Sequence, residues 1–129
     1  QILDLLGKVK REHGMGMILI SHDLGIVAEN AERTAIMYAG TIVESAPTAE
    51  LFSNPLHPYT QGLLDSLPQK ATPGTRLPTI PGQVPNLDSQ MQGCGFCDRC
   101  PDRLKECHKQ PPPVVQITDS HMVRCWKLT

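Results

Sequence analysis

The 129-residue sequence predicts an α/β fold whose regular elements lie in its first half. Amphipathic helical segments and short apolar runs alternate there, an order typical of helices layered on a sheet. Five prolines and three glycines follow within residues 67–93, and all five cysteines follow residue 93. We therefore predict an α/β part at 1–66, a Pro-rich linker at 67–93 and a small irregular cysteine-rich region at 94–129.

The first elements are expected to be a helix, a strand and a helix. Apolar side chains recur at helical spacing from residue 2 to 13, and Gly14 marks the end of this pattern. The continuous apolar run 17–20 predicts a strand buried on both faces. Asp23 is a favourable N-cap for a second helix over residues 24–31.

Two strands and two further helices are expected next. Residues 34–38 and 41–45 predict strands joined by a turn at Ala39-Gly40. Pro47 and Pro58 are each well placed to open a helix, the first through residue 52 and the second through residue 67. Tyr59 and Leu63 are four residues apart in the last of these helices, so we expect both to pack.

Composition excludes several classes of protein. The formal net charge of −1 gives no electrostatic reason to expect nucleic acid or anionic lipid as the main partner. No apolar run approaches the roughly 20 residues that span a bilayer. The chain starts at Gln1 without a basic leader, so we expect no signal peptide and interpret the sequence as a fragment of a longer protein. With an odd number of cysteines, these features favour a reducing, cytosolic compartment.

His22 is the first candidate for chemistry. It directly follows the apolar run 17–20, within Ser21-His22-Asp23. Ligands of open α/β sheets bind beyond the carboxyl ends of the strands, where an imidazole can contact a phosphate or orient a water molecule. A single histidine is a weak signal, and a structural or surface role is the simpler interpretation.

The cysteines are the second candidate. Cys94, Cys97, Cys100, Cys107 and Cys125 crowd into 36 residues that contain few large apolar side chains. Three interpretations compete. A structural zinc site would take four thiolate or imidazole ligands, with His108 and His121 as further donors. An iron–sulfur cluster would take four thiolates. Free thiols or disulfides would leave one cysteine over.

Several motifs together resemble the ABC-transporter ATPases. The segment Ile18 to Leu24 (ILISHDL), followed by Met37 to Glu44 (MYAGTIVE), is similar to the end of the ATPase cassette. The segment Asn54 to Thr60 (NPLHPYT), and later Ile80 to Pro85 (IPGQVP), resemble motifs of the oligopeptide/dipeptide importer subfamily. The resemblance extends over essentially the whole chain.

The resemblance implies a partial P-loop ATPase core that belongs to the ATP-binding subunit of an importer for peptides or related solutes. His22 matches the switch histidine, which contacts the terminal phosphate of ATP in that family. The intact subunit would use ATP and Mg²⁺, would pair with a second ATPase subunit and membrane-spanning permease subunits, and would lie peripherally on the cytoplasmic face of the membrane. The sequence contains no phosphate loop, no ABC signature and no catalytic carboxylate. We therefore expect this fragment to be inactive alone.

The resemblance also selects among the cysteines. Cys94, Cys100, Cys107 and Cys125 match four cysteines of the C-terminal extension of these ATPases. This match implies a 4Fe-4S cluster on those four residues, with zinc as the alternative metal. Cys97 departs from the family pattern and is either a spare thiol or an alternative ligand.

Two expectations remain beside this assignment. A zinc-binding interaction module without a nucleotide role is the alternative function, with His108 or His121 as a zinc ligand. The apolar faces that the rest of a cassette would cover also predict self-association of this chain.

Overall fold

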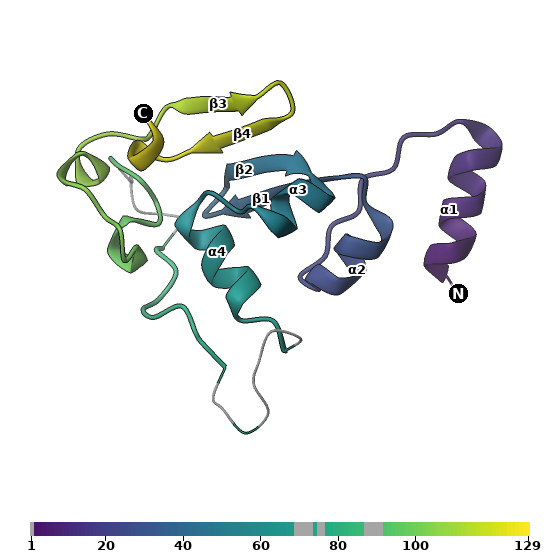
Figure 1. Ribbon diagram of the computed structural model, residues 1–129, viewed down its shortest axis with the longest axis horizontal. Coiled ribbons are helices and arrows are strands. Elements are labelled where there is room, and N and C mark those ends of the chain that lie inside the picture. Colours follow the sequence, from purple (N-terminus) through teal and green to yellow (C-terminus); the bar gives the residue numbers. More distant parts are fainter. Residues whose placement is uncertain (1, 69–73, 75–76, 87–91) are drawn as a thin grey trace.

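The computed structural model describes residues 2–68, 74, 77–86 and 92–129. The helices and strands in this part of the chain are α1 (Ile2–His13), α2 (Leu24–Asn30), β1 (Arg33–Tyr38), β2 (Thr41–Pro47), α3 (Thr48–Ser53), α4 (Pro58–Asp65), β3 (Val114–Thr118) and β4 (His121–Arg124). Figure 1 shows a sheet with α3 and α4 beside it, the cysteine-rich region at one end and α1 at the other. The predicted α/β class is confirmed in this small form.

One antiparallel sheet organises the molecule, with strand order β1-β2-β4-β3. The β1–β2 hairpin turns at Ala39 and Gly40, whose φ angles of 45° and 78° suit the tight turns that match strand twist. β4 pairs with β2 through Glu44 opposite Val123 and Ser45 opposite Met122. Strands from residues 33–47 and 114–124 thus share one sheet.

The C-terminal hairpin corrects the prediction that residues 94–129 are irregular. β3 has the sequence VVQIT and β4 the sequence HMVR, and β-branched residues of this kind favour strands. A short two-stranded hairpin is marginal alone. Here β4 lies against β2, so the hairpin is stabilised by a sheet whose other strands lie about 70 residues earlier in the chain.

The predicted elements of the first half are mostly confirmed. The two expected helices, α1 and α2, lie on either side of residues 14–23. Asp23 caps α2 by accepting hydrogen bonds from the amides of Gly25 (2.8 Å) and Ile26 (3.2 Å). The expected hairpin and the two proline-opened helices are present. α4 ends at Asp65, slightly before the predicted end.

The strand predicted at 17–20 is wrong for this structure. The segment is extended but unpaired, and Ile18 and Ile20 are 92% and 93% exposed. A strand needs neighbours that supply hydrogen bonds and cover its faces. The apolar run is typical of a buried strand, but the described part of the chain offers it no neighbouring strand.

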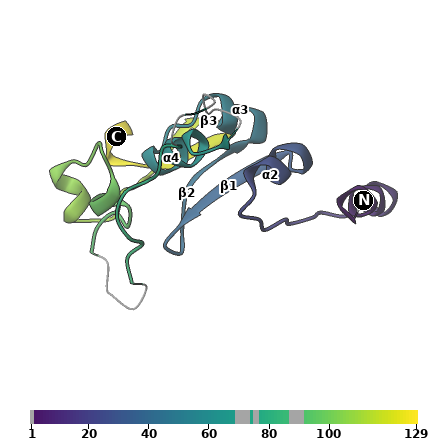
Figure 2. The same cartoon turned by 90° about the horizontal axis from the view of Figure 1, so that it is seen from below.

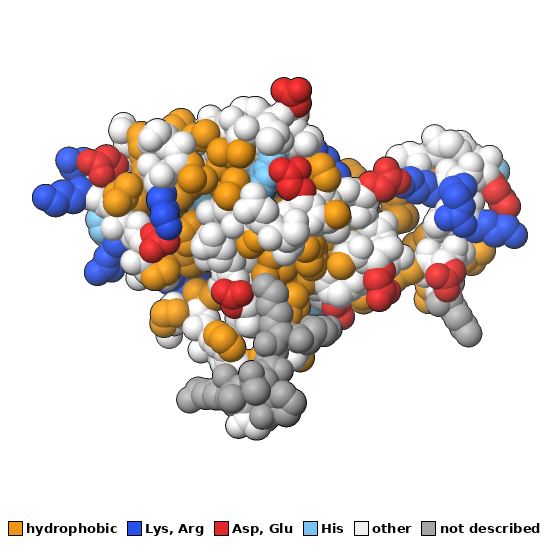
Figure 3. All heavy atoms as spheres, in the orientation of Figure 1, with side chains coloured by type: hydrophobic (Ala, Val, Ile, Leu, Met, Phe, Trp, Pro, Cys, Tyr) orange, Lys and Arg blue, Asp and Glu red, His pale blue; other side chains and the backbone are white. Residues whose placement is uncertain are grey.

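α1 also stands apart from the rest of the molecule. None of its residues is buried, and Ile2 and Leu5 are 78% and 60% exposed. Figure 2 shows the helix joined to the body through the extended segment, and Figure 3 shows it as a separate lobe with charged side chains. One ion pair also connects the two, since Nζ of Lys10 in α1 lies 2.7 Å from Oε1 of Glu32. Among the described helices, none has both the length and the apolar character to cross a bilayer.

The core joins the sheet to the cysteine-rich region. Its buried residues are Ile36, Tyr38, Val43, Ala46, Leu51 and Phe96. Phe96 is 2% exposed and comes from the loop between Cys94 and Cys97. Tyr59 and Leu63 of α4 pack against this core, as predicted.

Candidate metal centre

The cysteines lie on or beside two 3₁₀ turns and at the end of a strand. Cys97 opens the turn Cys97–Arg99, Cys107 lies in the turn Lys105–His108, and Cys125 directly follows β4. All five are within the described residues and none forms a disulfide. The disulfide interpretation therefore has no support in this structure.

Backbone contacts fix the two turns relative to each other. The amide of Cys94 donates to the carbonyl of Cys107 at 2.8 Å and so links the two, while the amide of Cys100 donates to the carbonyl of Cys97 at 3.2 Å within the first turn. Gly93 makes this approach possible, because a Cβ built there would lie 2.1 Å from the carbonyl oxygen of Cys107. Any larger residue at this position would push the two turns apart.

The thiols are electrostatically coupled. Burial raises the pKa of Cys94, Cys97 and Cys125 above the ordinary thiol value and that of Cys100 to about 11. Neighbouring thiols raise these pKa values further: Cys94 is affected by Cys107 and Cys125, and Cys100 by Cys125 and Cys94. These mutual effects make the four predicted ligands and Cys97 neighbours, but among the described residues the donor atoms found within 4.8 Å of one another are those of Cys97, Asp98 and His108.

This donor set suits a metal centre. Burial and mutual repulsion favour neutral thiols, so thiolates would require a strong local positive charge. A bound metal supplies such a charge and takes up soft sulfur donors. Cys94 and Cys100 also pack against the core, which gives the centre a rigid, largely apolar floor.

Phe96 anchors the centre to the sheet. Its ring lies edge-on to Tyr38 with centroids 5.2 Å apart, and Tyr59 is 5.3 Å away. Such aromatic pairs add stability beyond the area that they bury. The ring of Phe96 thus lies in the core, where it ties the segment between Cys94 and Cys97 to the sheet.

Arg99 connects the cysteine-rich region to the segment 77–86. Its Nε donates to the carbonyl of Pro81 at 2.8 Å and its Nη2 to that of Ile80 at 3.0 Å. Nη1 lies 3.3 Å from the hydroxyl of Tyr38. The planar guanidinium therefore holds the Ile80-Pro81-Gly82 motif against the core.

A buried cluster of polar groups fastens the C-terminal hairpin. Glu44 and His121 are both fully buried, and Oε1 of Glu44 lies 2.8 Å from Nε2 of His121. The same carboxyl group accepts hydrogen bonds from the amides of Leu56 (2.8 Å) and His57 (3.0 Å). Nδ1 of His121 lies 2.9 Å from Oε1 of Glu50.

These contacts settle the role of His121. Both of its ring nitrogens have a carboxyl partner, so neither is available to a metal. The expectation of His121 as a zinc ligand is therefore wrong. His108 is exposed and lies instead near Cys97 and Asp98, with one donor atom of each residue within 4.8 Å of the others.

His22 lies far along the chain and away from this centre. It is exposed in the bend between the extended segment and α2. Its neighbours shape the bend, since Ser21 Oγ accepts from the amide of Asp23 at 3.0 Å and Asp23 caps α2. In Figure 1 this bend lies at the start of α2, whereas the cysteine-rich region lies at the left end of the molecule.

The sequence did not predict the contacts that join the cysteine-rich region to the sheet, which are made by Glu44, His121 and Arg99. Glu44 and His121 are 77 positions apart, and no local pattern pairs them. One signal was available, because Glu44 directly follows the apolar pair Ile42-Val43 inside a predicted strand. A charged residue in such a position often has a buried partner.

Comparisons with known proteins agree with the family resemblance of the sequence. Residues 43–107 match the family described as "Oligopeptide/dipeptide transporter, C-terminal region". A Brucella ovis relative named as a peptide import ATP-binding protein is 49% identical over 131 residues, covering 97% of this chain and 39% of the relative. A Sinorhizobium fredii relative named as a peptide ABC transporter ATP-binding protein is 42% identical over 128 residues, covering 98% and 38%.

The chain thus spans about two fifths of the length of the curated relatives that it matches. The matched residues include the β1–β2 hairpin in part, both proline-opened helices and the cysteines from Cys94 to Cys107. The chain belongs to the oligopeptide/dipeptide transporter family and corresponds to a C-terminal part of the ATP-binding subunit of an oligopeptide-type ABC importer.

Proposed function

We propose that this chain contributes a metal–sulfur extension to the ATP-binding subunit of an ABC importer for peptides or related solutes. Cys94, Cys100, Cys107 and Cys125 would hold a 4Fe-4S cluster there. The cluster would fasten the extension to the sheet of the ATPase part. Zinc on the same four cysteines is the alternative outcome.

One observation supports this proposal: thiols from three separate backbone segments lie close enough to raise one another's pKa values, and Cys94 and Cys100 pack against the core. Three come from residues 94–100, one from the turn Lys105–His108 and one from the end of β4. Thiolates that converge from different directions are what a cubane cluster requires. Metal–thiolate bonds would also stabilise a region of 36 residues that has few large apolar side chains of its own.

The residues of the chain would have distinct tasks in this centre. The thiol groups would lose their protons as the metal binds, and the positive charge of the metal would offset the burial that raises their pKa values. The Gly93–Cys107 contact would keep two ligand-bearing turns at a fixed separation. Phe96 and the Arg99 contacts would hold those turns on the sheet.

Within the intact subunit, we assign nucleotide chemistry to residues outside the cysteine-rich region. His22 would contact the terminal phosphate of ATP, and its exposed position before α2 leaves the imidazole accessible. Two ATPase subunits and the permease subunits would complete the importer, with the ATPases on the cytoplasmic face. Since the sequence contains no phosphate loop, this chain alone is expected to show no ATP hydrolysis above that of a His22→Ala control.

Cysteine substitutions test the ligand set. The chain and its Cys107→Ser and Cys97→Ser variants would be purified without oxygen, and iron and acid-labile sulfide would be measured per chain. We expect iron to fall strongly in the Cys107→Ser variant and to stay at the wild-type level in the Cys97→Ser variant. Equal iron in all three proteins, or a loss only with Cys97→Ser, would reject the proposed ligands.

A further inference from the structure

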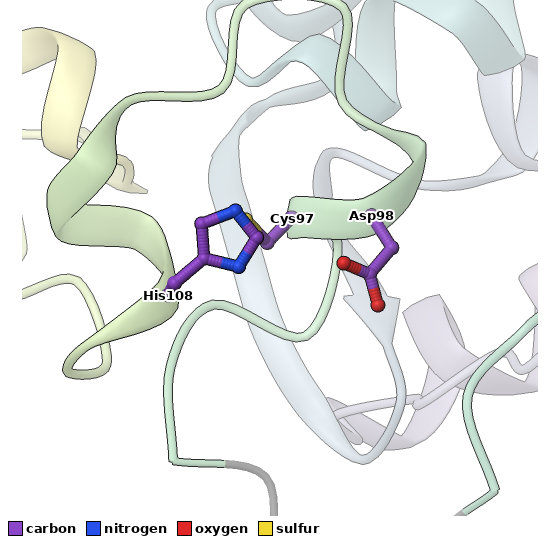
Figure 4. A group of neighbouring side chains, drawn as sticks. All are labelled: Cys97, Asp98 and His108. Atoms are coloured by element: carbon purple, nitrogen blue, oxygen red, sulfur yellow. The ribbon is translucent and has the colours of Figure 1, made fainter.

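A second group of donor atoms lies beside the four proposed cluster ligands. It consists of the Cys97 thiol, the Asp98 carboxyl group and the His108 imidazole, whose ligand atoms all lie within 4.8 Å of one another. Figure 4 shows Cys97 and Asp98 on one 3₁₀ turn and His108 on the other, with the imidazole in front of the Cys97 side chain. From this geometry we propose that Cys97, Asp98 and His108 form a separate binding site for one divalent zinc ion.

The chemistry of the donors points to zinc. A thiolate, an imidazole and a carboxylate are the three ligand types that zinc accepts in proteins. With zinc–ligand distances of about 2.0–2.3 Å, tetrahedral ligand atoms lie roughly 3.3–3.7 Å apart. With donor atoms within 4.8 Å of one another, the site needs a closure of at most about 1.5 Å, which side-chain rotations can supply.

The backbone already positions these donors. Cys97 and Asp98 belong to the turn Cys97–Arg99, which the amide of Arg99 closes by donating to the carbonyl of Phe96 at 3.0 Å. His108 directly follows Cys107, whose carbonyl is held by the amide of Cys94. A Cβ at Gly93 would also meet the backbone carbon of His108 at 2.9 Å. The residues that bring the turns together thus also bring the three donors together.

The surroundings leave room for the ion. Cys97 is 4% exposed, whereas Asp98 and His108 are exposed at the surface. Within the described ranges, no hydrogen bond or ion pair joins the Asp98 or His108 side chain to another residue. An ion would therefore reach the site from solvent, displace no existing contact, and keep a water molecule as its fourth ligand, as open zinc sites do.

This site also gives Cys97 a role distinct from that of the other cysteines. A zinc ion would join the Cys97–Arg99 turn to the Lys105–His108 turn from the solvent side. The cluster proposed above would join them from the core side. The zinc site does not depend on that cluster, because none of its three donors belongs to the proposed cluster ligands.

Metal analysis of the anaerobically purified chain tests the site. The protein would be incubated with zinc chloride and desalted, and zinc and iron would be measured per chain in the wild type and in His108→Ala and Asp98→Asn variants. Two exposed residues elsewhere provide matched controls, His13→Ala for the histidine and Asp119→Asn for the aspartate. We expect the wild type and both controls to bind one zinc more than the His108→Ala and Asp98→Asn variants. Zinc-edge X-ray absorption of that extra ion should show a single sulfur among nitrogen and oxygen ligands.

Three results would overturn the site: equal zinc in the wild type and the His108→Ala variant, a purely sulfur coordination of all bound zinc, or a loss of iron in the Cys97→Ser variant. The same measurements distinguish failure of the proposed cluster from failure of the zinc site. Absence of iron and sulfide would reject the cluster. The difference in zinc content between the wild type and the His108→Ala variant decides the zinc site, even if zinc also fills the four other cysteines.

Discussion

Single residues hold the cysteine-rich region on the sheet, and Glu44 is one of them through its contact with His121. Its carboxyl group is fully buried and faces one imidazole and two backbone amides. Removing one partner from such a group leaves the others buried without hydrogen bonds, which costs more than the contacts contribute on average.

Replacing Glu44 should therefore destabilise the protein strongly. We expect Glu44→Gln to lower the free energy of unfolding by about 2–4 kcal/mol, because an amide nitrogen would face donors that now meet oxygen. Urea unfolding followed by circular dichroism measures this change. Glu29→Gln, at an exposed position of α2, is the matched control and should change stability by less than about 0.5 kcal/mol. Similar values for both variants would contradict the role of Glu44.

Arg99 offers a second test at the residue scale. A lysine has one nitrogen and cannot reproduce two hydrogen bonds to the carbonyls of Ile80 and Pro81 together with the contact to Tyr38. We expect Arg99→Lys to lower stability by about 1–2 kcal/mol and to speed proteolytic cleavage within residues 77–86. Arg103→Lys, at an exposed position, should leave the cleavage rate unchanged. Cleavage at equal rates in both variants would show that Arg99 does not hold this segment.

Elements differed in how well the sequence predicted them. The β1–β2 hairpin and the start of α4 were predictable because turn residues and a proline mark them locally. The pairing of β4 with β2 was not, since it depends on contacts between residues almost 80 positions apart. For the run 17–20 the local pattern was clear but the prediction was wrong, because no strand lies beside it in the described structure.

The cysteines show a similar limit. Their crowding within 36 residues indicated a metal centre, and the family resemblance selected four of them. Spacing did not reveal that Cys97 lies near His108, because that contact depends on how two turns meet around Gly93. It also did not show that His121 is engaged by Glu44 and Glu50.

His57, the N-cap of α4, should make the stability of the protein depend on pH. Nδ1 of His57 accepts the amide hydrogen of Tyr59, and burial is the main cause that lowers the pKa of His57 from 6.5 to about 4. Between these values the unfolded chain binds a proton at this position that the folded chain does not. The free energy of unfolding should therefore fall by up to about 3 kcal/mol as the pH drops from 6.5 to 4.

The variant His57→Asn tests this assignment, because asparagine keeps a capping acceptor and removes the titrating ring. Urea unfolding at pH 7 and pH 5 should show a clearly smaller loss of stability in this variant than in the wild type. His13→Ala, on exposed α1, should retain the wild-type pH dependence. An unchanged pH dependence in the His57→Asn variant would exclude His57 as its source.

At the scale of the whole molecule, the N-terminal quarter exposes surface that the rest is not arranged to cover. Ile18 and Ile20 are almost fully exposed, and α1 presents Ile2 and Leu5 to solvent. We expect this chain to self-associate through that surface at high concentration. Light scattering should show a molar mass that rises with concentration and falls in an Ile18→Lys/Ile20→Lys double variant. Val84→Lys, at another exposed apolar position, should not reduce it. A constant monomer mass for the wild type would contradict the expectation.

The cysteine centre and the sheet form one unit at this scale. β4 ends next to Cys125, Phe96 lies in the core between Tyr38 and Tyr59, and the Glu44–His121 contact joins the hairpin to β2. A metal bound by the cysteines would thus stabilise the packing of the whole chain, and its loss would loosen the contacts of the C-terminal hairpin.

The central claim is that four cysteines hold an iron–sulfur cluster, and the most direct measurement is the metal content of the chain purified without oxygen. Iron, acid-labile sulfide and zinc would be determined on one sample together with its visible absorption spectrum. The account predicts about four irons and four sulfides per chain, with a broad absorption band typical of thiolate-bound clusters. Zinc bound by these cysteines without iron or sulfide, before and after anaerobic reconstitution, would contradict it.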